Sequence, residues 1–211
     1  MAPRSMLKMG FLARSVSFVR YHVKGAIETS FWDAVREGVV NGAFRPKEGP
    51  GDEIGFGWVS LQDFDDNEFA SSSYIYGSYV ALSYRLDVVR IPARVIEVHF
   101  KREKKKALEQ LGRPRLSSSQ ARDLKESIRE SLKAQAFPSI QVVDVVWDTG
   151  KSMAYVATQS QRLRERIEDH FKKSFGLTLV PMIPFIRAEQ LLRSAQDKEK
   201  LAQLKPESWA P

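Results

Sequence analysis

The amino-acid sequence predicts an α+β fold in which antiparallel sheets with packed helices flank a projecting, basic, antiparallel helical pair. Two observations lead to this prediction. Segments rich in β-branched and aromatic residues lie on both sides of a central region, and that region carries apolar residues at helical spacing. The chain therefore divides into a flexible leader, a first α+β portion, a helical-pair arm, a second α+β portion and a C-terminal helix with its tail. These parts cover residues 1–14, 15–91, 92–137, 138–186 and 187–211.

The first α+β portion begins with an alternating segment, residues 15–24, that is typical of a strand. Ser30 is then expected to cap a helix that runs to about Phe44. Strand-forming residues return at 54–59 and 79–89. This order indicates antiparallel strands with a helix on one face.

The central region has the start and stop signals of two consecutive helices. Pro92 is a favourable first helical residue, and Gly112 is typical of a helix end. Ser117 and Gln120 then form a capping-box pattern for a second helix that ends before Phe137. The connection is short, so the two helices are expected to pack antiparallel.

The second α+β portion is predicted to contain a β-hairpin followed by a helix and a short strand. Apolar runs at 140–147 and 153–157 are separated by a polar, glycine-containing turn. A helix over 160–175 and a short strand over 177–180 come next. A single charged helix is predicted over 187–204.

The charge is concentrated in the helical pair. The chain has 33 basic and 26 acidic residues, a net charge of +7, and residues 101–133 hold eleven of the basic and five of the acidic ones. This favours an anionic partner, and a row of basic side chains on one helix face can follow the phosphates of duplex DNA without reading bases. The predicted DNA contacts are Lys101, Arg102, Lys104, Lys105, Lys106, Arg113, Arg115, Arg122, Lys125, Arg129 and Lys133. The alternative interpretation is a solvated helix face.

No catalytic centre, metal site, cofactor or small-molecule ligand is predicted. The absence of cysteine excludes thiol chemistry and indicates a cytoplasmic protein, and the N-terminal apolar stretch is too short for a membrane span. The three histidines lack the spacing of metal ligands. The acidic cluster of Asp63, Asp65, Asp66 and Glu68 is the best candidate for a cation site, although a solvated turn explains it more simply. A metal-dependent nuclease that uses this cluster stays open as an alternative.

Several short segments, taken in order, resemble the RdgC family of recombination-associated proteins. They span about residues 16–185. The matching segments are Phe18–Tyr21, Phe31–Trp32, Ala43–Pro46, Phe56–Val59, Arg85–Asp87 with Ile91–Pro92, Leu124–Glu126, Ala136–Phe137, Val145–Thr149 and Leu179–Pro181.

The resemblance implies a nucleoid-associated protein that binds double-stranded DNA and limits the access of the strand-exchange recombinase to it. Better-known family members form a head-to-head ring dimer around duplex DNA, so a homodimer is expected. Phe137 matches the aromatic residue at which the helical arms of such members meet, and its alternative role is simple packing at the helix end. This chain is shorter than the family pattern, which puts ring closure in doubt. A second functional reading is a basic interaction module that engages an acidic protein or an anionic membrane surface.

Overall fold

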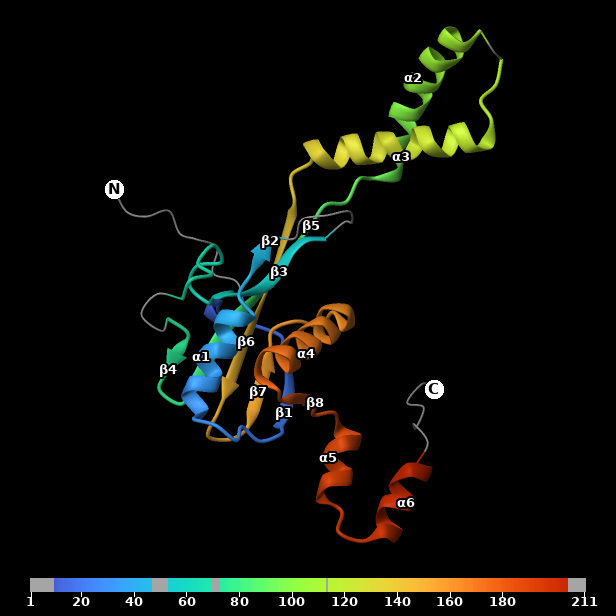
Figure 1. The fold of residues 1–211 in the computed structure, drawn as a ribbon. Helices are drawn as coiled ribbons and strands as arrows, with labels where there is room; N and C mark the ends of the chain where they lie inside the picture. The colour runs from blue at the N-terminus through green and yellow to red at the C-terminus, as the bar shows by residue number, and fades with distance from the viewer. Residues whose placement is uncertain (1–9, 47–52, 70–72, 113, 205–211) are drawn as a thin grey trace. The chain divides into compact units, whose positions relative to one another are not determined.

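The computed structural model describes residues 10–46, 53–69, 73–112 and 114–204 (Figure 1). The described residues form the predicted α+β fold, with six α-helices and one eight-stranded sheet where several sheets were expected. The strands are β1 (Val19–Lys24), β2 (Arg45–Pro46), β3 (Glu53–Ser60), β4 (Ile75–Tyr76), β5 (Tyr79–Val88), β6 (Ser139–Asp148), β7 (Met153–Val156) and β8 (Thr178–Pro181). The helices are α1 (Phe31–Asn41), α2 (Ala93–Leu111), α3 (Ser118–Gln135), α4 (Gln161–Phe175), α5 (Pro184–Leu191) and α6 (Ala195–Gln203).

The sheet has the strand order β2-β3-β5-β6-β7-β1-β8, and β4 pairs with β5. The fold comprises two compact units, which we name the core unit (residues 1–43, 58–84 and 143–211) and the helical unit (residues 44–57 and 85–142). Strands β3, β5 and β6 contribute residues to both units. The core unit contains α1 and α4, and the helical unit contains α2 and α3.

The hairpin of β6 and β7 confirms the sequence prediction. The two strands pair antiparallel, with Trp147 opposite Ala154. The turn is closed because the Lys151 backbone N–H donates to Asp148 Oδ1 at 3.1 Å. The next strand in the sheet, β1, pairs antiparallel with β7 on one side and with β8 on the other. The sheet of the core unit therefore combines strands from the two ends of the sequence.

Helices α1 and α4 lie side by side on one face of the sheet in the core unit (Figure 1). Their close approach depends on Gly38, because a Cβ there would lie 2.5 Å from the Ser174 carbonyl oxygen. The predicted helix is confirmed with Ser30 at its N-cap position, but it ends at Asn41 and not at about Phe44, and the Ser30 side chain makes no capping hydrogen bond. Packing against α4 explains how this helix is held without the cap.

Trp58 is the centre of the aromatic core of this unit. Its side chain is fully buried, and its ring centroid lies 4.8 Å from that of His170 and 6.1 Å from that of Phe175. The indole N–H donates to Ser174 Oγ at 2.9 Å. The sheet and α4 thus share one core in which the only strongly polar atom of the tryptophan is satisfied.

The predicted leader over residues 1–14 is only partly described. Residues 10–12 form a short 3-10 helix, η1 (Gly10–Leu12), and the Phe11 backbone N–H donates to Asp144 Oδ2 at 2.9 Å. The Ser83 hydroxyl donates to the other oxygen of Asp144 at 2.7 Å. Burial raises the pKa of Asp144, and these two hydrogen bonds oppose the rise. This end of the predicted leader is therefore attached to the core unit.

The C-terminal region contains two helices where the sequence predicted one. Helix α5 ends at Leu191 and α6 begins at Ala195. Ser194 caps α6, since its hydroxyl oxygen accepts from the Asp197 backbone N–H at 3.1 Å. A local capping interaction of this kind competes with a continuous helix, and apolar periodicity alone does not reveal the competition. The predicted tail from residue 205 onward lies outside the described residues.

Candidate nucleic-acid interface

The two helices of the helical unit form as their sequence signals predict. Helix α2 ends at Leu111 and is capped by Gly112, whose φ of 60° is left-handed. Helix α3 begins with both bonds of the capping box, from the Gln120 backbone N–H to Ser117 Oγ at 3.2 Å and from the Ser117 N–H to Gln120 Oε1 at 3.0 Å. The helices contact each other, but each buries only one residue, Ile96 in α2 and Ile128 in α3. Most of their surface is therefore open to a partner.

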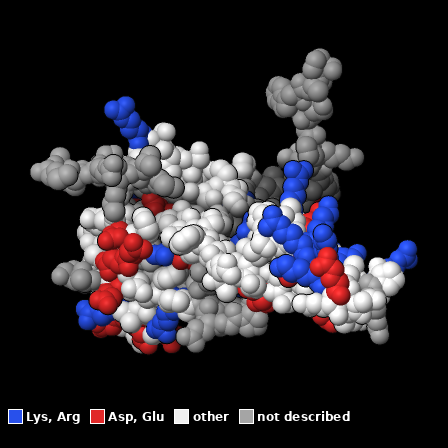
Figure 2. Space-filling view, turned by 90° about the horizontal axis from the view of Figure 1, so that it is seen from above, with Lys and Arg blue, Asp and Glu red and all other residues white. Residues whose placement is uncertain are grey.

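The basic run in α2 is mostly exposed. Lys101, Arg102, Lys105 and Lys106 are exposed, and Lys104 is half-buried. Figure 2 shows Lys and Arg side chains gathered on the surface, with a smaller number of acidic side chains beside them. Lys106 pairs with Glu103 of its own helix at 2.7 Å.

The predicted basic stripe on α3 is divided by ion pairs. Arg122, Lys125 and Arg129 are exposed, whereas the Lys133 side chain is only 16% exposed. Arg129 pairs with Glu126 at 2.8 Å and Lys133 pairs with Glu130 at 3.2 Å. The pair of Arg129 with Glu126 is exposed, and exposed pairs contribute little to stability, so a phosphate can replace this carboxylate at small cost.

Phe100 connects the cations of the two helices. The Lys125 ammonium of α3 lies 4.9 Å from the centroid of the Phe100 ring, and Lys104 of α2 lies 6.0 Å from it. The ring attracts both ammonium groups. It therefore holds positive charge from both helices over one apolar side chain, which sequence spacing did not indicate.

The remaining predicted residues lie between α2 and α3 or just after α3. Arg115 is exposed, and Arg113 lies outside the described residues. Phe137, just beyond α3, is 95% exposed. Its alternative role as helix-end packing is therefore wrong, and its role at a dimer contact stays a prediction.

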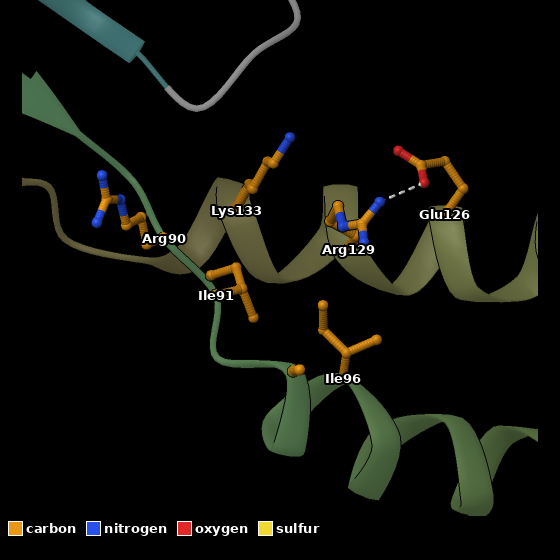
Figure 3. Close-up of a pocket in the computed structure, with 7 residues that line it drawn as sticks. Arg90, Ile91, Ile96, Glu126, Arg129 and Lys133 are labelled. Carbon is orange, nitrogen blue, oxygen red and sulfur yellow. Dashed lines mark hydrogen bonds and ion pairs between the residues drawn. The ribbon is translucent and has the colours of Figure 1, made fainter. Parts of the chain in front are cut away.

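The structure also brings two predicted basic residues, Arg129 and Lys133, into one pocket with Arg90, which sequence reasoning missed. A pocket of about 540 Å³ lies between the start of α2 and the second half of α3. Arg90 and Ile91 line it from the segment before α2, together with Ile96, Arg129 and Lys133 (Figure 3). Arg90 precedes the basic run by eleven residues, so only the packing of the two helices places it in the same pocket as Arg129. The sequence feature that could have identified Arg90 is its position just before a predicted basic helix.

The acidic cluster uses its carboxylates to shape a turn. Asp63 Oδ1 accepts from the Asp65 backbone N–H at 3.0 Å, and Asp66 Oδ1 accepts from the N–H groups of Glu68 and Phe69 at 3.1 and 3.0 Å. Such side-chain bonds are typical of aspartate turns. Within the residues that the structure describes, no three acidic or histidine side chains gather in a way that could hold a metal ion.

The three histidines lie in different surroundings. His170 Nε2 is 2.9 Å from the Gly42 carbonyl oxygen, inside the core unit. Burial lowers its pKa, and nearby Lys173 lowers it further, while the hydrogen bond to Gly42 opposes the change. His22 Nδ1 is 3.1 Å from the Val23 carbonyl oxygen, in the same unit, and His99 lies on α2.

None of the helices in the described ranges is both long and apolar enough to span a bilayer. A family model described as "Putative exonuclease, RdgC" matches residues 19–193. No curated protein matches the chain. The match covers most of the sequence, from the first strand to the end of α5, and it confirms the resemblance carried by the short motifs. The chain therefore belongs to the RdgC family.

Proposed function

We propose that this protein binds double-stranded DNA through α2 and α3 without reading its sequence, and thereby limits the access of a recombinase to DNA. One observation carries the proposal. Residues 101–133 account for six of the seven net positive charges of the chain, and most of their described basic side chains are exposed. The membership of the chain in a recombination-associated family supports the same function.

Duplex DNA is the anion that this surface fits best. It carries about one negative charge per 1.7 Å of helix axis, and each phosphate that a cation neutralises releases counterions. Cations spaced along two helices can contact several phosphates together. Lysines dominate the run in α2, and an ammonium group acts as a point charge that tolerates many phosphate geometries. Contacts to phosphates position a protein on DNA but carry no sequence information.

The protein is proposed to act by binding and not by catalysis. In the acidic turn, which was the best candidate for a nuclease metal site, one carboxylate oxygen of Asp63 and one of Asp66 accept hydrogen bonds from backbone N–H groups. The exposed ring of Phe137 supports a homodimer in which this residue meets a second copy of the chain. Binding to chromosomal DNA would place the protein at the nucleoid.

Fluorescence anisotropy tests this function. The full chain is titrated into two unrelated duplexes of roughly 40 base pairs and one single strand, over a range of salt concentrations. We expect equal affinities for the two duplexes and a fall in log affinity that is linear in log salt, with a slope of about −0.9 per phosphate contacted. Absence of binding at low salt would contradict the proposal and favour a protein partner.

A second experiment tests whether the protein degrades DNA. End-labelled linear duplex is incubated with the protein and magnesium, and its length is followed on a gel. We expect intact DNA. Degradation that requires magnesium and is lost in Asp65→Ala would instead support the nuclease alternative.

A further inference from the structure

The pocket between α2 and α3 differs from the rest of the basic surface. It combines three cations from two parts of the chain with an apolar floor. Figure 3 shows Arg90 on the segment before α2, Arg129 and Lys133 on α3, and Ile91 and Ile96 between the two helices. Ile96 is 9% exposed, so the floor of the pocket is part of the small helix-helix core.

The charges of the pocket favour an anion. Three cations and one carboxylate, that of Glu126, line the pocket, and Glu126 pairs with Arg129 Nη1 at 2.8 Å. Lys133 also pairs with Glu130 of its own helix at 3.2 Å, so the three cations exceed the two carboxylates by one charge. A guanidinium has five N–H donors in a planar fork, so an arginine can hold a carboxylate and a phosphate together. The Lys133 side chain is 16% exposed, and charges that are partly buried are screened less by salt than those on an open helix face.

The shape and floor of the pocket restrict which anion fits. The volume of about 540 Å³ is larger than a single phosphate needs and lies within the range of small-molecule sites. Ile91 and Ile96 offer an apolar surface that suits the C–H face of a sugar next to the phosphate. The ligand class that matches the charge, the volume and the apolar floor of the pocket is a sugar phosphate.

We propose that this pocket is a discrete binding site for one sugar-phosphate unit of the DNA backbone. The inference rests on the proposed function. Arg90 and Arg129 donate to the phosphate oxygens, Lys133 supplies charge, and the deoxyribose lies on the two isoleucines. Within the helical unit, the pocket thus fixes DNA at one point, while the lysines of α2 contribute charge without a fixed geometry.

Methyl-detected NMR of the full chain, labelled at the isoleucine δ1 carbons, tests the site. A short duplex of about 12 base pairs should shift the Ile91 and Ile96 signals, whereas the signal of Ile183 in the core unit should not move. Deoxyadenosine 5′-monophosphate and inorganic phosphate are added separately. Tight, saturable binding of the nucleotide that a duplex does not displace would overturn the proposal and make the pocket a nucleotide site.

Two double variants separate the pocket from general electrostatics. Arg90→Gln with Lys133→Gln removes two pocket cations, and Lys105→Gln with Arg122→Gln removes two exposed cations of the same helices. We expect the pocket variant to lose about tenfold more duplex affinity than its control, because charge-assisted hydrogen bonds in fixed geometry are stronger than screened contacts. Circular dichroism checks that both variants fold.

The outcomes distinguish this inference from the function on which it rests. If the unaltered chain binds no duplex at low salt, the proposed function fails. If the duplex binds, but the two double variants lose equal affinity and the Ile91 and Ile96 signals stay in place, only the pocket proposal fails.

Discussion

The core unit and the helical unit use their side chains in opposite ways. In the core unit, α4 buries Ile167, Phe171 and Phe175 against the sheet, and Trp58 is fully enclosed. In the helical unit, α2 and α3 bury one isoleucine each and expose most of their charge. Burial of large apolar side chains is the main source of folding free energy. The core unit therefore carries stability, and the surface of the helical unit is available for binding.

Substitutions in the core unit should therefore change stability, and substitutions on the surface of the helical unit should change binding. A helix with little burial depends on caps and local pairs, and α3 has both a complete capping box and i,i+3 ion pairs. The capping box involves no cation, and an exposed ion pair such as that of Arg129 with Glu126 contributes little to stability. The cations can then be altered at small cost to the fold.

Trp58→Ala is the strongest test of the core unit. The substitution removes a fully buried indole and leaves a cavity beside His170 and Phe175. We expect the free energy of unfolding to fall by about 3–5 kcal/mol, measured by chemical denaturation. Trp32→Ala, at a tryptophan that is 42% exposed, is the matched control and should cost much less. Similar losses in the two variants would refute the assignment of stability to this core.

Charge reversal of the helical unit has the next largest expected effect. Changing Lys105, Lys106, Arg122 and Arg129 to Glu should lower duplex affinity at least about a hundredfold, since phosphate contacts dominate such binding. The measurement is anisotropy at fixed salt. The folded state should persist, because all four residues are exposed.

A control with the same change in charge uses the core unit. Lys24, Arg36, Arg162 and Arg187 are also exposed, and their reversal to Glu should weaken binding far less. Equal losses in the two quadruple variants would mean that net charge, and not the surface of α2 and α3, determines the affinity.

The smallest expected effect is a dependence of stability on pH in the core unit. The pKa of His170 is lowered in the folded protein, mainly by burial. Below its unfolded value of about 6.5, the unfolded chain takes up a proton that the folded chain resists, so stability falls as pH falls. Between pH 7.5 and 6.0 the loss should reach about 0.8 kcal/mol at most. Denaturation at several pH values measures it.

His170→Gln supplies the control, because an amide keeps a hydrogen-bond donor near the Gly42 carbonyl oxygen but does not titrate. The variant should lose this part of the pH dependence. If the wild-type and the variant show the same slope between pH 7.5 and 6.0, another group is responsible.

Much of the fold could be predicted from sequence because its signals are local. The capping box at Ser117, the left-handed Gly112 and the turn after Asp148 each act over three or four residues. The prediction of a single C-terminal helix was wrong, because the helical pattern of the segment competed with the capping hydrogen bond of Ser194, which begins a second helix. The basic surface was also predictable, since exposed charge depends on composition and helical spacing.

The sequence alone determined the fold class, the family resemblance and the position of the basic helices. Which of those cations share a site depends on the packing of the two helices, which places Arg90 in one pocket with Arg129 and Phe100 beneath Lys125. The tertiary structure also joined strands from both ends of the chain and brought α1 against α4 at Gly38. The physical reason is that helices, turns and charge density arise from neighbours in the chain, whereas pockets and cores arise from packing between residues that are distant in sequence.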